Sequence, residues 1–383
     1  MNVSKTIGYV GVDDFDLDLF EGQYPVPNGM AYNSYVVCGE KIAVMDSVDG
    51  RFSAQWLQNI ATYLEGKSPD YLVVQHMEPD HSGSVVAFMQ AYPNAKIVSS
   101  GKAFIMMKGY FGTDFAGRNV VVGEGDALDL GNRTLTFYTA PMVHWPEVIV
   151  TYDDKDKILF SADAFGKFGA LSVEEDWACE ARRYYFGIVG KYGVQASALL
   201  KKAGGLDVEK ICPLHGPVLE GDLSYYLDLY RTWTSYGVES EGIFIAYTSV
   251  YGNTERAVKL LVKALEEKGQ KVVLTDLARS DMSEAVEDAF RYGKIVLATT
   301  TYNGGVFPFM REFLSHLAEH NFQNRRIALI ENGSWAPMAA KEMKKLLEGC
   351  KNLCFAETTV KILCSLNEES LAQLNKLADE LCK

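Results

Sequence analysis

The sequence lacks a long hydrophobic run and a positive charge balance, and each absence excludes a class of protein. No apolar run approaches the roughly 18 residues that cross a membrane. The formal net charge is −13, which argues against binding to a nucleic-acid backbone. The first residues, MNVSKTIGYVGVDDFD, turn acidic at once and carry no apolar signal segment. We therefore expect a cytoplasmic protein with neither a membrane nor a nucleic acid as partner.

The sequence also lacks any pair of cysteines with C-x-x-C spacing. Neither a structural zinc site nor a rubredoxin-type iron site is therefore encoded by the cysteines. An odd, scattered set is typical of unpaired thiols in a reducing cytoplasm. The seven cysteines are Cys38, Cys179, Cys212, Cys350, Cys354, Cys364 and Cys382.

The length of 383 residues predicts two domains, because one hydrophobic core rarely serves so long a chain. The pattern changes near residue 241. From Gly242 onward, five short apolar runs alternate with five amphipathic stretches, including helices predicted over 282–291 and from Glu368. Such alternation predicts a parallel, doubly wound α/β sheet in residues 242–383.

Residues 1–241 follow a different pattern. Strand-like runs such as YLVVQ, NVVVG and TLTFYTA come with few helices between them. This pattern predicts two sheets packed face to face, with helices outside. The sequence contains no internal repeat and no low-complexity linker between the two domains.

Histidine is scarce, yet four of the six histidines directly follow strand-like runs. His76 and His81 lie in YLVVQHMEPDHSGS, His144 in TLTFYTAPMVHWPE and His215 in KICPLHGP. Asp163 ends the run KILFSAD in the same way. Polar residues at strand ends can meet at one edge of a sheet, where binding sites concentrate.

The densest group is His76-x-Glu78-x-Asp80-His81. A tight loop after a strand can point these side chains into one volume, ahead of a helix expected from Ser82 and Gly83. Imidazoles and carboxylates at this density suit divalent transition metals, and two ions are needed to use them all. The remaining pair, His316 and His320, has helical spacing but no H-E-x-x-H context, and we interpret it as a solvated helix face.

This motif resembles that of the metallo-β-lactamase superfamily, whose common form is H-x-H-x-D-H. Glu78 stands where a second histidine is usual, and the harder ligand shifts the metal preference from zinc toward iron. Together with a flavodoxin-like second half, the whole chain resembles the flavodiiron proteins. The resemblance implies an αββα sandwich over 1–241 and a flavodoxin-like sheet over 242–383.

The resemblance also implies a ligand set. It assigns one iron to His76, Glu78 and His144, and a second iron to Asp80, His81 and His215. Asp163 would bridge the two ions, and His81 is the least secure ligand. Two neighbouring tyrosines in EARRYYFGIVGKYG, Tyr184 and Tyr185, are candidates to donate protons or orient the substrate.

Three loops of the second half predict a flavin site. The loop Thr248-Ser249-x-Tyr251-Gly252-Asn253-Thr254 joins a strand to a helix and resembles the flavodoxin T-x-T-G-N-T loop, which holds the FMN phosphate without a cation. The loops that begin at Thr300 and Asn332 follow the third and fourth strands and should flank the flavin ring. The predicted FMN-binding residues are Thr248, Ser249, Tyr251, Gly252, Asn253, Thr254, Thr301, Tyr302, Asn303, Gly304, Gly305, Gly333, Ser334, Trp335 and Ala336.

The resemblance implies an oxidoreductase. Electrons would pass from a separate donor, such as rubredoxin or a reduced deazaflavin, through FMN to the two irons. The irons would reduce dioxygen to water, nitric oxide to N2O, or both; the residues do not choose between the gases. A head-to-tail homodimer, or a dimer of dimers, would bring one subunit's FMN beside the other's irons.

Two alternatives stay open at this stage. One is a zinc hydrolase with an accessory flavodoxin domain, and Glu78 argues against it. The other is a non-catalytic electron carrier or gas sensor, which would cycle its flavin without consuming either gas.

Overall fold

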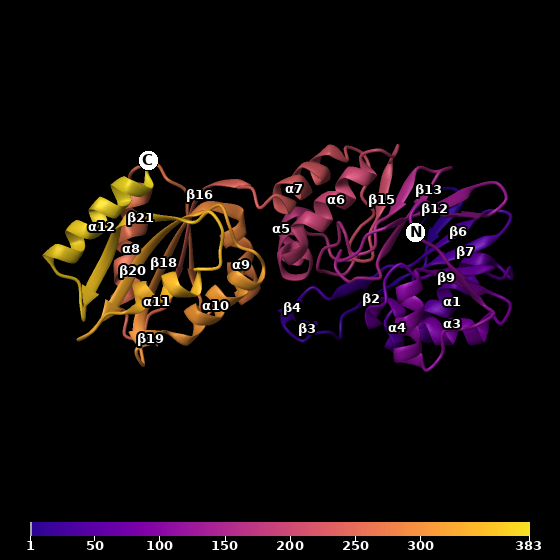
Figure 1. Cartoon of the computed structure of the whole chain (residues 1–383), viewed down its shortest axis with the longest axis horizontal. Helices are drawn as coiled ribbons and strands as arrows, with labels where there is room; N and C mark the ends of the chain where they lie inside the picture. Colours follow the sequence, from indigo (N-terminus) through magenta and orange to yellow (C-terminus); the bar gives the residue numbers. More distant parts are fainter. Residues whose placement is uncertain (1) are drawn as a thin grey trace. The chain divides into compact units, whose positions relative to one another are not determined.

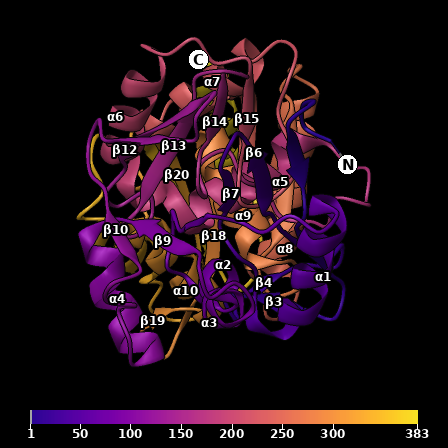
Figure 2. The ribbon, with the colours of Figure 1, turned by 90° about the vertical axis from the view of Figure 1, so that its right-hand side faces the viewer.

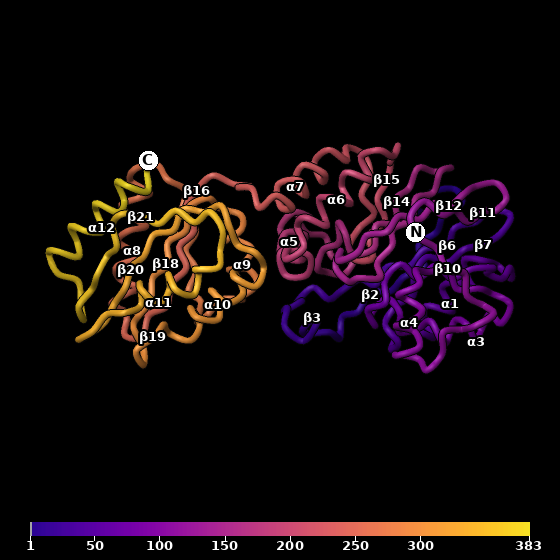
Figure 3. Tube along the Cα trace, in the orientation of Figure 1, coloured from indigo at the N-terminus to yellow at the C-terminus, as the bar shows by residue number. Residues whose placement is uncertain are grey.

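A computed structural model describes residues 2–383. The chain divides into two compact units, Met1–Arg231 and Thr232–Lys383. The trace in Figure 3 shows that each unit is built from one continuous stretch of chain. The domain boundary predicted at residue 241 stays a prediction. No helix among residues 2–383 is both long and apolar enough to cross a membrane.

Unit 1 contains two mixed sheets. The first has the strand order β1 (Ile7–Tyr9), β6 (Tyr35–Cys38), β7 (Ile42–Met45), β8 (Tyr71–Val73), β9 (Lys96–Ser99) and β10 (Asn119–Val121). The second has the order β11 (Ala127–Asp129), β12 (Thr134–Thr139), β13 (Ile149–Asp153), β14 (Ile158–Phe160) and β15 (Lys210–Cys212). Two short ribbons pair β2 (Val12–Asp14) with β5 (Met30–Tyr32) and β3 (Leu19–Phe20) with β4 (Tyr24–Pro25).

The two sheets face each other across one hydrophobic core. Val37 and Val73 from the first sheet meet Phe137 and Phe160 from the second, and all four are fully buried. Helices α1 (Ser53–Leu64), α3 (Val85–Ala91) and α4 (Gly101–Phe111) gather on one side of the unit (Figure 2). Helices α6 (Gly193–Ala203) and α7 (Ser224–Thr234) lie on the other side, and α5 (Trp177–Tyr184) precedes them in the chain. The predicted αββα sandwich is confirmed.

Unit 2 is a five-stranded parallel sheet with helices on both faces (Figure 1). The strand order is β17 (Val272–Asp276), β16 (Ser240–Tyr247), β18 (Tyr292–Tyr302), β20 (Arg326–Gly333) and β21 (Cys354–Leu363). A two-residue strand, β19 (Gly305–Val306), pairs with the end of β18. Numbered by its own strands the order is 2-1-3-4-5, the flavodoxin-like topology, which confirms the prediction for this half.

The helices of unit 2 bury apolar stripes against the sheet. Helices α8 (Asn253–Glu266) and α12 (Glu368–Leu381) share one core, in which Leu261 and Leu377 are fully buried. The other helices are α9 (Met282–Arg291), α10 (Pro308–Glu319) and α11 (Ala339–Leu346). The helices predicted over 282–291 and from Glu368 are confirmed at those residues.

One local prediction is wrong. Asp80 and His81 do not lie in a loop, because they form the short helix α2 (Pro79–Ser82). Pro79 occupies the first turn, where its fixed φ suits a helix and its missing N–H costs nothing. The helix predicted to start at Ser82 and Gly83 begins later, as α3 at Val85 with Ser84 as its N-cap.

Candidate metal centre and flavin pocket

Four connections at strand ends of unit 1 carry the predicted metal ligands. His76 follows β8, and Glu78 directly precedes helix α2, which holds Asp80 and His81. His144 lies between β12 and β13, Asp163 follows β14, and His215 follows β15. Gly216, with a φ of +78°, lets the chain turn after His215: a Cβ there would lie 2.6 Å from Cγ of Lys167.

The structure brings all seven predicted ligands together in two groups. The potential ligand atoms of the first group lie within 4.8 Å of one another, and the same limit holds for the second. Among residues 2–383 there is no further group of this kind, and neither of the two groups includes His316 or His320. The first group is His76, Glu78, His144 and Asp163; the second is Asp80, His81 and His215.

Asp163 faces both groups with different oxygens. Its Oδ2 lies 3.2 Å from Nε2 of His76 and 3.0 Å from Nε2 of His144. Its Oδ1 lies 3.3 Å from Nε2 of His81 and 3.7 Å from Nε2 of His215. A carboxylate with one oxygen toward each group has the geometry of a bridging ligand.

The second group is equally compact. Nε2 of His81 lies 2.9 Å from Nε2 of His215, and Oδ2 of Asp80 lies 3.2 Å and 3.3 Å from these two nitrogens. In the first group, Oε2 of Glu78 lies 3.0 Å from Nε2 of His144 and 3.3 Å from Nε2 of His76. Each group therefore directs nitrogen and oxygen lone pairs at one small volume.

The donor set fits two divalent transition-metal ions. It offers four imidazoles and three carboxylates and no thiolate, which suits iron, manganese or zinc. Both oxygens of Asp80 and both of Asp163 are buried, and none accepts a well-formed hydrogen bond from residues 2–383. Such orphaned oxygens are costly unless a cation compensates them.

The protonation behaviour of the cluster follows from the same packing. Burial alone lowers the pKa of His144, but its close contacts with the carboxylates of Asp163 and Glu78 raise it to about 9. Burial works against the charge of Asp163 as well, yet the surrounding imidazoles hold the pKa of that carboxyl well below its usual value. Imidazole–carboxylate pairs of this kind hold protons that a divalent cation displaces when it binds.

Two acidic residues near the cluster were missed at the sequence level. Oε1 of Glu147 lies 2.8 Å from Nδ1 of His76, and the only signal was its place three residues after His144 in HWPE. Glu21 lies in the connection between β3 and β4. Its side chain is exposed, yet partial desolvation together with the charge of Glu78 raises the pKa of Glu21 to about 7. Its distance along the chain from the ligands left no pattern to find it by.

The two candidate tyrosines differ in their surroundings. Tyr184 is 1% exposed and its ring lies 5.4 Å from that of His215. Burial, then the charge of Asp163, raises the pKa of Tyr184 well above its usual value, so the phenol stays protonated. The Tyr185 ring instead packs against Phe186 and Tyr230. The role of either tyrosine stays a prediction.

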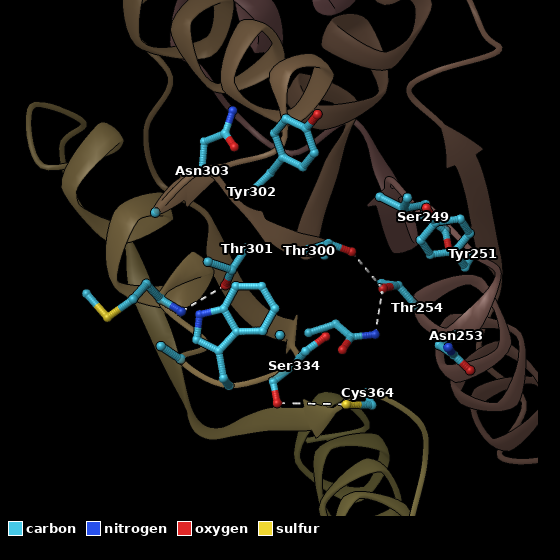
Figure 4. A pocket seen from close by; sticks show the side chains of 17 residues that line it. Ser249, Tyr251, Asn253, Thr254, Thr300, Thr301, Tyr302, Asn303, Ser334 and Cys364 are labelled. Atoms are coloured by element: carbon cyan, nitrogen blue, oxygen red, sulfur yellow. Dashed lines mark hydrogen bonds between the residues drawn. The ribbon is translucent and has the colours of Figure 1, made fainter.

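The predicted flavin loops of unit 2 line a pocket of about 490 Å³. Figure 4 shows Ser249, Tyr251 and Thr254 on one side of this pocket, and Tyr302 with Asn303 on another. Within the described chain, no charged side chain lines the pocket, as expected for a phosphate held by backbone and hydroxyl groups. Its residues are Ser249, Val250, Tyr251, Asn253, Thr254, Thr300, Thr301, Tyr302, Asn303, Gly304, Asn332, Gly333, Ser334, Trp335, Ala336, Met338 and Cys364.

Hydrogen bonds hold the pocket in shape. Oγ of Ser249 accepts from the backbone N–H groups of Gly252 and Glu255, which fastens the loop to the start of α8. Oγ1 of Thr301 accepts from the backbone N–H groups of Met338 and Ala339 at the start of α11. Helix N-termini of this kind favour phosphate groups.

Most but not all predicted flavin residues line this pocket. Thr248 is 1% exposed, and its hydroxyl lies 2.6 Å from that of Thr299. Gly252 and Gly305 also lie outside the lining. The lining residues absent from the predicted set are Val250, Thr300, Asn332, Met338 and Cys364.

Large aromatic side chains stand exposed at the pocket. Tyr251 is 93% exposed, Trp335 91% and Tyr302 45%. Exposed aromatics grouped around a hollow are typical of a binding site for a flat ligand or a partner surface. The pocket therefore fits an aromatic ring system with an attached phosphate, such as FMN.

Both halves of the chain match known protein families. Residues 30–216 match the family model described as ODP family beta lactamase. Residues 245–371 match the flavodoxin family model. These ranges contain all seven predicted metal ligands and all residues that line the pocket.

Known proteins also match along nearly the whole chain. An anaerobic nitric oxide reductase flavorubredoxin of Escherichia coli is 28% identical over 359 residues, which are 90% of this chain and 74% of that protein. The solved structure of a rubredoxin oxygen:oxidoreductase from Desulfovibrio gigas is 27% identical, with a TM-score of 0.92 over 100% of this chain and 97% of that one. A flavodiiron protein from Giardia intestinalis is 25% identical, with the same TM-score over 99% and 95% of the two chains.

Proposed function

Because this chain belongs to the flavodiiron protein family, we propose that it reduces dioxygen to water, nitric oxide to N2O, or both. One FMN and two iron ions are the cofactors. Relatives named for each gas support the two substrates: the Escherichia coli protein is a nitric oxide reductase and the Desulfovibrio gigas protein a rubredoxin oxygen:oxidoreductase. The proposed site of action is the cytoplasm.

The observation that carries this proposal is the pair of ligand groups that share Asp163. Each group would hold one iron, and Asp163 would contribute an oxygen to both. Both ions would then lie within reach of one diatomic molecule. When bound, the two irons and FMN would together supply the electrons that the formation of N2O or water requires. The residues of the chain position the ions, exclude bulk water and hold protons near them, because all seven ligands except Glu78 are buried.

The seven metal ligands keep the roles assigned above, and the flavin residues are those that line the pocket. Ser249, in the loop before α8, and Thr254, at the start of that helix, would receive the phosphate. Tyr302 and Trp335 would lie beside the flavin ring. Among the predicted residues, Thr248 and Gly252 would act by shaping the loop rather than by touching the ligand.

The electron donor is proposed to be a separate protein or a reduced deazaflavin, and rubredoxin is supported by the name of the Desulfovibrio gigas relative. We further propose that two chains form a head-to-tail homodimer. The exposed aromatic residues around the pocket, Tyr251, Tyr302 and Trp335, support this arrangement, since a second subunit would cover them.

Stopped-flow mixing tests the function. Protein loaded with iron and FMN is reduced without oxygen and mixed with dissolved O2 or NO, while flavin absorbance and gas consumption are followed. We expect rapid, stoichiometric reoxidation by at least one gas, and little with a zinc-loaded control. Two tightly bound zinc ions together with thioesterase activity of the protein would support a hydrolase instead. Flavin cycling without consumption of either gas would support a non-catalytic electron carrier.

A further inference from the structure

The three fully buried imidazoles of the metal cluster differ in what lies behind them. Nδ1 of His76 lies 2.8 Å from a carboxylate oxygen of Glu147. Nδ1 of His215 lies 2.7 Å from the backbone carbonyl oxygen of Ala31. Nδ1 of His81 has no hydrogen-bond partner among residues 2–383. Of these three rings, His76 alone is supported by a charged group.

The contact sets the tautomer of His76. A carboxylate can only accept, so Nδ1 carries the proton and donates it to Oε1 of Glu147. The same oxygen also accepts from the backbone N–H of Met77 at 2.9 Å. The lone pair of Nε2 is thereby directed at the cluster, where Asp163 and Glu78 lie 3.2 Å and 3.3 Å away.

Glu147 is held rigidly from several sides. The Ser100 hydroxyl, which caps helix α4, donates to the backbone oxygen of Glu147 at 2.7 Å. Two residues later, the N–H of Ile149 donates to the carbonyl oxygen of Gln75 at 3.1 Å. The Trp145 ring lies edge-on to the His76 ring with centroids 5.2 Å apart. The imidazole and its carboxylate therefore form one fixed unit.

The ligands by themselves give the two groups equal charge. Each contains one carboxylate of its own, Glu78 or Asp80, and Asp163 faces both. Glu147 is 2% exposed and adds a negative charge behind the first group only. Its Oε2 has no hydrogen-bond partner among the described residues. A cation on the far side of His76 would compensate this buried charge.

We propose that Glu147 is a positioning residue that fixes the His76 imidazole toward its metal and makes that metal position the more electron-rich of the two. A carboxylate behind a ligating histidine raises the basicity of the ring. The more electron-rich iron is easier to oxidise, so the iron at His76 should lose its electron first. The inference rests on the proposed di-iron function and goes beyond it by making the two positions unequal.

The test uses the full-length protein with the variant Glu147→Gln. The amide oxygen can still accept from His76 and Met77, so the shape is kept and only the charge is lost. The midpoint potentials of the iron pair are measured by redox titration followed by electron paramagnetic resonance. We expect the potential of the more easily oxidised iron to rise, by about 59 mV for each tenfold loss of preference for the oxidised form.

Affinity for zinc alone is measured in parallel on metal-free protein. We expect the site that contains His76 to weaken by roughly 10- to 100-fold in Glu147→Gln. The matched control is Glu124→Gln, the same change in unit 1 at a carboxylate that binds Lys202 and Thr139 instead of a ligand. The control should leave both measurements unchanged. Glu147→Asp keeps the charge and should recover part of both effects.

Unchanged iron potentials and unchanged zinc affinity in fully loaded Glu147→Gln would overturn the proposal. If Glu147→Gln does not fold, Glu147→Asp still decides, because it should then fold and weaken zinc binding measurably. Failure of the proposed function looks different: the protein would bind zinc but not reduce O2 or NO. In that case the zinc affinities and the tautomer of His76, read by nuclear magnetic resonance, still test the positioning role.

Discussion

At the scale of single residues, Glu78 has the largest effect on the expected chemistry. It replaces the second histidine of the common metallo-β-lactamase motif and lies beside both His76 and His144. A carboxylate is a harder ligand than imidazole and brings a negative charge, and both properties favour iron over zinc.

We therefore expect Glu78→His to shift metal preference toward zinc. After reconstitution with equal amounts of ferrous and zinc ions, the bound iron-to-zinc ratio should fall by about tenfold or more, and gas reduction should fall with it. Elemental analysis by mass spectrometry gives the ratio, and Glu124→His is the surface control. An unchanged ratio would show that Glu78 does not set the preference.

The two neighbouring tyrosines give a second prediction. Tyr184 lies against His215, whereas Tyr185 packs on Phe186 and Tyr230. If the protonated phenol of Tyr184 supplies protons near the irons, Tyr184→Phe should lower kcat by roughly 100-fold. Iron content should stay the same. Tyr185→Phe is the matched control and should keep kcat within about twofold of wild type; equal losses in both variants would contradict the assignment.

The sequence contained enough information to predict the ligands but not the residues around them. His76, His144 and His215 could be predicted because scarce histidines follow apolar runs, and the structure brings all three into the cluster. Glu147 and Glu21 belong to no motif of this sort, since acidic residues are abundant in a chain with 50 of them. Only the folded chain brings these two carboxylates to the ligands.

At the scale of elements, long amphipathic segments were predictable and short polar ones were not. Helices α9 and α12 begin at the predicted residues because each has an apolar stripe and a polar cap, Asp281 or Asn367. The four-residue helix α2 has no room for such a stripe, so its polar residues were interpreted as a loop. Packing against the rest of unit 1, rather than local propensity, determines such a segment.

The turn after β7 contains a buried carboxyl group that makes the stability of the fold depend on pH. Asp46 is fully buried and accepts hydrogen bonds from the backbone N–H and the side-chain amide of Gln75 at 2.7 Å and 2.8 Å. Burial raises the pKa of Asp46 to about 6 despite these bonds. The folded state thus holds a proton that the unfolded state releases above about pH 4, and stability from this group is lost as the pH rises toward and through 6.

The variant Asp46→Asn removes this titration. Oε1 of Gln75 has no partner among residues 2–383, so a rotated Gln75 amide can pair with the new asparagine. Between pH 5 and pH 7.5 the wild type should lose about 1.4 kcal/mol of unfolding free energy relative to Asp46→Asn. Urea unfolding of metal-free protein at both pH values measures the difference. A difference independent of pH would contradict the prediction.

At the scale of the whole molecule, the two compact units carry separate sites. The metal ligands belong to Met1–Arg231 and the pocket to Thr232–Lys383. The change of pattern near residue 241 predicted two separate domains. Alternating strands and helices are typical of a parallel α/β sheet, whereas a run of strands is typical of a different architecture. The pairing of subunits could not be predicted from the residues, since no sequence pattern specifies which surfaces meet.

Mixing two inactive variants tests the head-to-tail dimer. The first, His76→Ala with His215→Ala, loses metal but keeps the flavin pocket. The second, Ser249→Asp, keeps the loop contacts to Gly252 and Glu255 but repels the phosphate. In a head-to-tail dimer, the FMN of the first variant lies beside the irons of the second, so a mixed dimer contains one working pair. We expect each variant alone to be inactive.

Co-expression should therefore restore gas reduction, to about half the turnover of wild type per mixed dimer. Transfer within a single chain predicts the opposite result, because neither chain of the mixed dimer holds both cofactors. Two different affinity tags isolate the mixed dimer, and flavin and iron contents confirm its composition. A mixed dimer with both cofactors and no activity would show that electrons pass within one chain. Restored activity would show that each subunit completes the site of its partner.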